Sequence, residues 1–435
     1  MQTNTGTSTK TETNTGSINA FPGYEFVKGE DGKYHNMYRG EDVGFGGYVF
    51  GKEGMYGRTV VLDVSGMHPA SIRAMNCLGD YTKRYGEIVD LRTAIKHKEF
   101  DKAKTMLGGA VAKYLNDPAA AKGLSAALKI VVNSGYGCTS AKFENPFRDS
   151  RNKNNIVALR GALFMVTLRD EVTARGGNVI SIKTDSIKLV DPSDEIIQFV
   201  KDFGIKYGYN FEVENIFDRI CLVNKSTFIA HCADDDPETP GEWLAKADQF
   251  QVPYVYKTLF SHEPIEFEDM CEILSVKTAL YLRGNDGEPE FIGKVGQFCP
   301  IKPGRGGKEL LRLGKDADGN KKFSAATGTK GYFWLESEVV RALGKEDDID
   351  RSYYDKQVNK AIETINKYGD FEMFTDLSVP FSLPKSELSE QDFSNTTPCH
   401  HPEHKSCWEC EHFTWSEPYE PDCSKNFDVS GVLPF

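Results

Sequence analysis

Two acidic residues in short apolar segments are the first candidates for chemistry. Asp63 lies near the end of the apolar run 59–64, just before a turn at Gly66 and Pro69, and Asp185 lies in the segment NVISIKTDSIKLVD, which predicts two strands and a tight turn. Two carboxylates on neighbouring strands can hold Mg²⁺, which keeps waters and substrate phosphates in its shell. Two such ions ~3.5–4 Å apart can bind both the attacking and the leaving oxygen of an in-line displacement. The pair therefore predicts metal-assisted phosphoryl transfer.

A third segment offers a basic helix face. Lys129, Asn133 and Tyr136 stand at i, i+4 and i+7, so they share one face of a helix. A cation on that face could neutralise a triphosphate. Taken singly, each signal has a structural alternative, since an Asp at a strand end is usually structural and a Lys-x3-Asn pair is usually a surface face. The order and spacing of all three segments favour the catalytic interpretation.

That order resembles family B DNA polymerases of the bacteriophage type. Residues 63–72, DVSGMHPASI, are similar to motif A of the family, and residues 129–137, KIVVNSGYG, match motif B at every defined position. Residues 183–186, KTDS, resemble motif C in their last three positions, and Phe45-Gly46-Gly47 is loosely similar to the link into the palm. The resemblance covers roughly residues 21–385. It implies DNA-templated transfer of dNTPs to a primer 3′-hydroxyl in phage DNA replication.

The resemblance also implies a role for each matched residue. Asp63 and Asp185 would hold two Mg²⁺ ions, with the Val64 carbonyl as a further ligand. Residues expected to bind the incoming nucleotide are Arg92, Lys96, Lys129, Asn133, Tyr136, Met67 and His68. Residues expected to contact the primer or DNA are Thr184, Ser186, Gly137 and Lys225.

The sequence departs from the family at two site positions. His68 stands where the family has a Tyr that blocks a 2′-hydroxyl, which predicts weaker rejection of ribonucleotides. Lys183 stands where the family has the first Asp of motif C. Three positions for its side chain are open: beside Asp63, on a primer phosphate, or in solvent.

Two alternative functions remain open. A non-catalytic subunit with a polymerase fold, binding DNA or a partner protein, would explain Lys183 and His68, but it has no physical need for the charge set Asp63, Asp185 and Lys129. A reverse transcriptase is disfavoured by motif B and by the lack of a paired Asp-Asp turn. Only 62 residues precede Asp63, too few for the family's 3′→5′ exonuclease domain. A separate exonuclease-bearing subunit, as in a split polymerase, is therefore the expected partner, besides primer-template DNA and dNTPs.

The pattern of strands and helices predicts an α+β, right-hand polymerase fold, because no βαβ repeat is present. We expect a disordered tail (1–20), a link and motif A strand (21–79), fingers helices (80–145), a palm with motif C (146–235) and a thumb-like region (236–390). Within the fingers, a helix pair is broken at Gly108-Gly109 and a further helix ends at Gly135 and Gly137. A later helix ends at Gly176-Gly177, and Ser193 caps the next.

Composition limits the remaining possibilities. The net charge is −12, which excludes a nonspecific DNA coat but not a local binding cleft. Residues 300–322 form a basic, Gly-rich stretch that either follows a phosphate backbone or is a solvated loop. No apolar run reaches the roughly 18 residues of a membrane span, and the N-terminus has no apolar signal core. We expect a protein without membrane contact, in the cytoplasm of an infected bacterial host.

Ten cysteines fit a reducing compartment. Six are spread along the chain and are expected to be buried thiols: Cys77, Cys138, Cys221, Cys232, Cys271 and Cys299. The other four, Cys399, Cys407, Cys410 and Cys423, crowd into the Cys/His-rich segment 391–435. One Cys-x2-Cys pair with two more Cys at loop-like distances predicts a Zn²⁺ site, although the irregular spacing also suits free thiols.

Overall fold

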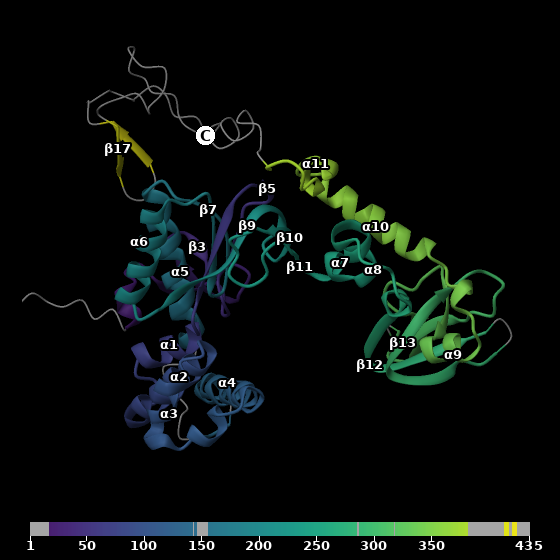
Figure 1. Cartoon of the computed structure of the whole chain (residues 1–435), viewed down its shortest axis with the longest axis horizontal. Helices are drawn as coiled ribbons and strands as arrows, with labels where there is room; N and C mark the ends of the chain where they lie inside the picture. The colour runs from purple at the N-terminus through teal and green to yellow at the C-terminus, as the bar shows by residue number, and fades with distance from the viewer. Residues whose placement is uncertain are drawn as a thin grey trace, which may run out of the picture.

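The fold is α+β, with curled antiparallel sheets and helices that cover one face of the largest sheet (Figure 1). This computed structural model describes residues 17–141, 143–145, 155–284, 287–316 and 318–381, and the backbone of a hairpin formed by β17 (Phe413–Ser416) and β18 (Glu420–Cys423). Cys399, Cys407 and Cys410 lie outside the described residues, and the side chain of Cys423 is not described. The predicted zinc site therefore stays a prediction.

The largest sheet has eight strands, in the order β11-β10-β9-β6-β8-β7-β4, with β5 paired to β9. All neighbouring strands are antiparallel. The predicted strand over 59–64 is confirmed as β6, and the predicted strand–turn–strand is confirmed as β7 and β8. The strands are β4 (Val49–Gly51), β5 (Gly54–Tyr56), β6 (Thr59–Val64), β7 (Asn178–Lys183), β8 (Ser186–Val190), β9 (Phe211–Asn224), β10 (Thr227–Cys232) and β11 (Trp243–Lys246).

Strand alternation gives the two faces of this sheet different roles. Val60, Leu62 and Val64 of β6 belong to one buried apolar cluster with residues of α5 (Ile156–Ala174) and α6 (Asp194–Lys206). Helix α5 is buried along most of its length, as expected for a helix that is apolar on all sides. It ends before Gly176-Gly177, and the Ser193 side chain accepts the Ile196 N–H at the start of α6, as predicted. The alternate residues Val61 and Asp63 therefore face away from the helices.

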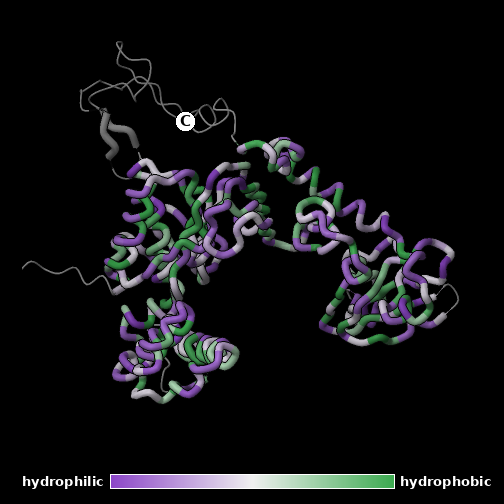
Figure 2. Tube along the Cα trace, viewed as in Figure 1, coloured by the Kyte–Doolittle hydropathy of each residue, from purple (hydrophilic) through white to green (hydrophobic). Residues whose placement is uncertain are grey.

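The second face is partly enclosed because β9 bends. Its first half pairs with β6, and its second half pairs with β5 and β10. A bulge opposite Val61 and Leu62 leaves Glu214 unpaired, and bulges increase strand twist and bend. Phe217, Ile220 and Phe228 then pack over Val61. Apolar residues accordingly concentrate on the strands of the large sheet (Figure 2).

Four helices follow β6: α1 (Met67–Ala74), α2 (Thr82–Lys96), α3 (Phe100–Thr105) and α4 (Pro118–Ser140). The expected break at Gly108-Gly109 is present, since both residues have positive φ. The expected end of the next helix at Gly135 and Gly137 is wrong, because α4 continues to Ser140. Gly135 has a packing role instead: a Cβ there would lie 2.6 Å from the Tyr85 ring, whose hydroxyl donates to the Val132 carbonyl.

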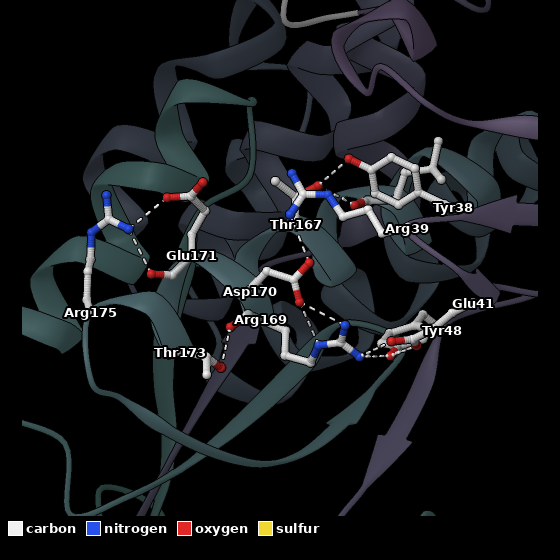
Figure 3. A network of polar contacts seen from close by, with 11 residues as sticks. Tyr38, Arg39, Glu41, Tyr48, Thr167, Arg169, Asp170, Glu171, Thr173 and Arg175 are labelled. Carbon is white, nitrogen blue, oxygen red and sulfur yellow. Dashed lines mark hydrogen bonds and ion pairs between the residues drawn. The ribbon is translucent and has the colours of Figure 1, made fainter. Parts of the chain in front are cut away.

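The chain before β4 packs against α5. A small sheet of β1 (Glu25–Lys28), β2 (Tyr34–Tyr38) and β3 (Glu41–Asp42) follows a short 3-10 turn at Ile18–Ala20, so the end of the expected tail is ordered. Figure 3 shows the polar network that fastens this sheet. Arg169 of α5 forms ion pairs with Glu41 (2.7 Å) and Asp170 (2.8 Å) and donates to the Tyr48 hydroxyl.

The C-terminal part contains a small barrel that stands apart from the large sheet (Figure 1). Its strand order is β15-β14-β12-β13-β16, and Lys308 and Trp334 exchange two backbone hydrogen bonds (2.9 and 2.7 Å) that close β16 onto the start of β14. Trp334 fills the core. The strands are β12 (Glu272–Arg283), β13 (Glu290–Ile301), β14 (Glu309–Lys315), β15 (Lys321–Ala325) and β16 (Phe333–Glu336). Within the basic stretch 300–322, residues 309–315 form β14 and residues 321–322 begin β15, whereas residues 302–306 and 318–320 are exposed outside the strands. The interpretation as a solvated loop therefore holds for part of the stretch.

Helices connect the barrel to the large sheet. They are α7 (Asp248–Gln251), α8 (Pro253–Tyr256), α9 (Ser337–Ala342), α10 (Ser352–Ile365) and α11 (Phe371–Thr375). The buried Arg219 of β9 donates to the carbonyls of Phe374, Asp376 and Val379, which fastens the segment after α11 to the sheet. Within the described part of the chain, no helix combines the length and apolar character needed to cross a bilayer.

Candidate active site

The structure brings Asp63 and Asp185 together on the open face of the large sheet. Asp63 lies directly opposite Ser186 on β8 and Glu212 on β9. The Val64 N–H donates to the Asp185 carbonyl (2.9 Å), which ties motif A to the motif C turn. Both carboxylates are half-buried. Two acidic residues from distant segments thus lie at neighbouring strand ends of the large sheet, in a partly enclosed position.

The turn that carries Asp185 is strained. The Asp185 N–H donates to the Lys183 carbonyl (2.7 Å), so the turn is centred on Thr184, which has φ +59°. A positive φ is unusual for a β-branched residue, and such backbone strain clusters at functional sites. The Thr184 N–H donates to the Tyr48 carbonyl (2.8 Å). Tyr48 is held in turn by Glu41 and Arg169, so the network in Figure 3 supports the turn.

Gly47 is the close neighbour that this turn requires. A Cβ at Gly47 would lie 2.3 Å from the Thr184 Oγ1, which no packing tolerates. A Cβ at Gly46 would meet nothing within 4 Å. Within the loose sequence match at Phe45-Gly46-Gly47, the close approach of Thr184 thus requires glycine at position 47.

Burial favours protonation of both acidic residues, and repulsion by neighbouring carboxylates adds to this at Asp63. Burial, followed by the charges of Asp185 and Glu214, raises the pKa of Asp63 to about 8, against the opposing charges of Lys96 and Lys188. Burial also raises the pKa of Asp185. A half-buried pair of carboxylates that resists ionisation is a typical arrangement where a cation completes the site.

Two charged neighbours were not predicted from the sequence. Glu214 is the bulge residue of β9, and burial raises its pKa. Lys188 lies opposite Val61 on the face that carries Asp63, and its ammonium sits 5.1 Å from the centre of the Phe228 ring. Burial lowers the pKa of Lys188 to about 8, against the charges of Glu214 and Asp63. The bulge of β9 places Glu214 near the site, and the pairing of β8 with β6 places Lys188 on the face of Asp63.

Lys96 reaches this cluster from the end of α2. Its Nζ lies 3.3 Å from Glu212, which stands opposite Asp63, and His97 lies 3.1 Å from the same carboxylate. Burial opposes ionisation of Glu212, but the charges of Lys96 and His97 hold its pKa below the usual value. Arg92, one turn earlier, is half-buried, and its Nε has no hydrogen-bond partner among the described residues.

His68 and Tyr136 join the motif A and motif B segments. Their rings stack with centroids 4.4 Å apart and an interplanar angle of 26°. Burial lowers the pKa of His68, although the Asp185 charge opposes this, so the ring is neutral near pH 7. The Tyr136 hydroxyl lies 3.0 Å from the Asn155 Oδ1 and is held by it.

The remaining predicted residues differ in burial and position. Lys129, Asn133 and Gly137 are exposed on α4, whereas Met67 is buried in the core beside Gly161. Lys225 is exposed at the tip of the β9–β10 hairpin, next to Gly51. Thr184 and Ser186 flank Asp185. Lys183 is exposed, with no ion pair to any acidic residue that the structure describes, so the expected position beside Asp63 is wrong and the positions in solvent and on a primer phosphate stay predictions.

The donor set suits Mg²⁺. Asp63 and Asp185 supply carboxylates, and the Val64 carbonyl accepts the Gly66 N–H but keeps a second lone pair. Two protein carboxylates suffice for an ion that retains waters and substrate phosphates. Within the described ranges, no three His, Cys, Asp or Glu side chains are grouped so that they could hold a metal ion.

Comparisons with known proteins give a distant likeness. No protein-family model matches the chain, and no curated protein sequence matches it. Among solved structures, the family B DNA polymerase from the hyperthermophilic archaeon Pyrobaculum calidifontis is similar over 74% of this chain, with 13% identity and a TM-score of 0.40. The matched part is 46% of that polymerase, so the chain spans about half its length. A similarity this low says nothing about activity, and the functional argument rests on the site itself.

Proposed function

We propose that this chain is a DNA-templated DNA polymerase of the family B type that adds dNTPs to a primer 3′-hydroxyl. In this proposal the eight-stranded sheet is the palm, α1–α4 are the fingers and the C-terminal region is thumb-like. The observation that carries the proposal is the meeting of the three motif segments. Asp63 and Asp185 share one sheet edge, and Tyr136 of the Lys-x3-Asn helix stacks on His68.

Asp63, Asp185 and the Val64 carbonyl would hold the catalytic Mg²⁺. When bound, the ions would activate the primer hydroxyl and neutralise charge on the triphosphate. The raised pKa values of the two carboxylates fit this role, because burial makes each carboxylate costly to ionise and a bound cation would offset that cost.

The fingers residues would bind and orient the nucleotide. Lys96 now pairs with Glu212 at the level of Asp63, so it would exchange this carboxylate for triphosphate oxygens when a nucleotide enters. Arg92 has an unpaired Nε one turn away. The His68–Tyr136 stack would lie against the sugar and the nascent base pair, as the resemblance implies.

Primer extension on a DNA template tests the proposal. With Mg²⁺ and dNTPs, the wild type should extend the primer, and Asp185→Asn should lower the rate by at least about a hundredfold, the scale seen for a lost transition-state interaction. Asp191→Asn is the matched control, because Asp191 is exposed at the far end of the same hairpin, at φ +43°, a region that Asn tolerates. Equal rates for wild type and Asp185→Asn would overturn the proposal.

The alternative is a non-catalytic DNA-binding or assembly subunit with a polymerase fold. The observation that favours it is Lys183, a cation beside the motif C turn. Mg²⁺ titration by calorimetry separates the two: a polymerase should bind Mg²⁺ in the presence of a primer-template and dNTP and lose this binding in Asp185→Asn. A scaffold should show neither extension nor such binding.

A further inference from the structure

The barrel formed by β12–β16 carries a charge and an aromatic cluster that the proposed active site does not use. Residues 272–336 contain eleven Lys and Arg against eight Asp and Glu, in a chain whose net charge is −12. The barrel lies at the opposite end of α10 from the large sheet (Figure 1). Its outer surface is therefore a separate candidate for binding.

Register places three aromatic side chains on one outer face. Tyr281 lies opposite both Phe291 and Leu311, and Phe323 lies opposite Leu313, two residues further along β14. The Tyr281 ring contacts Phe291 at 5.6 Å and Phe323 at 4.9 Å, both at steep angles. These rings cover Leu311, which is 4% exposed.

The same rings remain open to solvent. Phe291 is 64% exposed and Phe323 is 39% exposed, although the barrel already has a complete core around Trp334. Clusters of exposed aromatic side chains on a protein surface often mark a binding site. The exposed ring surface thus needs a ligand with flat apolar faces.

Unpaired cations border this aromatic cluster. Lys315 lies directly opposite Lys321, on the face that carries Leu313 and Phe323. Like charges in opposed positions destabilise a strand pair, and neither lysine has an ion pair within the described residues. Lys322 and Arg312, on the same two strands, are also exposed and unpaired among the described residues. The turn acid Asp316 instead accepts the backbone N–H groups of Asp318 and Asn320.

Some other barrel cations are neutralised, although the exposed Lys277, Lys294 and Lys330 also have no ion pair within the described residues. Lys308 pairs with Glu290 (2.7 Å), and Arg283 pairs with Glu309. Arg305 lies 3.5 Å from Asp348. The β14–β15 hairpin therefore carries four of the unpaired barrel cations, Arg312, Lys315, Lys321 and Lys322, and two of them, Lys315 and Lys321, share the face of Phe323.

We propose that this face, defined by Tyr281, Phe291, Phe323, Lys315 and Lys321, binds single-stranded DNA. Bases stack on exposed aromatic rings while cations bind the backbone, the combination used for single strands without sequence preference. A duplex hides its base faces, so the rings select against it. The choice of DNA over RNA rests on the proposed polymerase function, which places template DNA at this chain. The proposed binding of a single strand rests only on the rings and cations of this face.

Local crosslinking tests this site on the full chain. An oligonucleotide of about 15 nucleotides carrying 5-iododeoxyuridine covers the usual site size and crosslinks to stacked aromatic rings on irradiation. We expect crosslinked peptides that contain Phe291 or Phe323, mapped by mass spectrometry. Crosslinks confined to the rest of the chain would overturn the proposal, as would equal competition by a duplex or stronger competition by a single-stranded RNA of the same length.

Variants then assign the contributions. Phe291→Ala and Phe323→Ala should each reduce the barrel crosslink and weaken single-strand binding about tenfold. Lys315→Gln with Lys321→Gln should lower the salt slope of binding by about 1.4, that is about 0.7 for each lost phosphate contact. Lys360→Gln with Lys367→Gln, two exposed lysines on and just after α10, removes the same charge elsewhere and should change neither. Unchanged crosslinking in the face variants, with folding verified by circular dichroism, would also overturn it.

The outcomes remain separate from those for the active site. Failure of primer extension with intact barrel crosslinks would remove the polymerase proposal and leave the single-strand site. Normal extension without barrel crosslinks would remove the single-strand site and leave the polymerase proposal.

Discussion

The imidazole ring of His68 stacks on the phenol ring of Tyr136, with centroids 4.4 Å apart. His68 is the second residue of α1, the helix that follows β6, and Tyr136 lies in the last two turns of α4. The contact therefore fixes the distance between the two segments that would enclose the nucleotide sugar. It also limits how far a larger side chain at position 68 could move.

Sugar selection follows from this contact. Imidazole fills less space than phenol, so the wild type should discriminate only weakly against ribonucleotides, and His68→Tyr should raise the dNTP:rNTP ratio of kcat/KM about tenfold or more. Tyr136→Phe keeps the stack and loses only the bond to Asn155, so its ratio should match the wild type. Equal ratios for wild type and His68→Tyr would contradict the prediction.

The Asp185 turn should depend on Gly47. Gly47→Ala places a Cβ 2.3 Å from the Thr184 Oγ1 and should displace the turn, lowering kcat at least about tenfold, since small misplacements of reacting groups are costly. Gly46→Ala is the control, because a Cβ there meets nothing within 4 Å. Adding Thr184→Gly to Gly47→Ala removes the clash and suits the positive φ, so it should restore part of the rate. A fully active Gly47→Ala enzyme would show that the turn tolerates displacement.

The acidic cluster should make stability depend on pH. The pKa of Asp63 is raised from 3.8 to about 8, so the folded state holds this proton more tightly than the unfolded chain does. The corresponding stability is fully present below pH ~4 and is lost as the pH rises through about 8. Asp63→Asn removes this loss and should raise Tm at pH 8 by about 2–4 °C for each kcal/mol of repulsion relieved.

At pH 3 the same substitution should leave Tm nearly unchanged, because Asp63 is then largely protonated in both states. Thermal unfolding of wild type and Asp63→Asn across this pH range measures the difference. Added Mg²⁺ should reduce the gap at pH 8, because it neutralises the carboxylate only in the wild type. A constant Tm difference at all pH values would show that the charge of Asp63 is not the cause.

Signals within a few residues predicted most of the helices and strands. Features that depend on contacts between distant parts of the chain were missed. Strand β6, the turn at Asp185 and the cap at Ser193 follow from apolar runs, turn chemistry and hydrogen-bonding side chains within a few residues. The end of α4 was misplaced because Gly135 serves the approach of Tyr85, a contact between two helices. Glu214 was missed because a bulge in β9 brings it to Asp63, and Lys188 was missed because the register between β6 and β8 places it on the same face. The barrel escaped prediction since its closure depends on pairing between strands far apart in the sequence.

A thiol pair in the barrel provides a final prediction. The sulfur atoms of Cys271 and Cys299 lie 3.3 Å apart, so these two cysteines are neighbours although they are distant in the sequence. A hydrogen bond from the Cys299 thiol lowers the pKa of Cys271, whereas the same contact and burial raise the pKa of Cys299. The Cys271 thiolate should therefore react first with an oxidant.

Diamide should convert the pair to a disulfide, with two thiol hydrogens and two electrons passing to the reagent, which becomes a hydrazine. Mass spectrometry of a digest without reductant should show the peptides of Cys271 and Cys299 joined and 2 Da lighter than their reduced sum, reversibly with dithiothreitol. The buried Cys221, whose pKa is raised by burial to about 12, should remain unreacted as an internal control. In Cys271→Ser, Cys299 should stay reduced, because its sulfur is buried and has lost its only described thiol neighbour. A digest in which Cys271 pairs preferentially with another cysteine would show that the two sulfurs are not held together in solution.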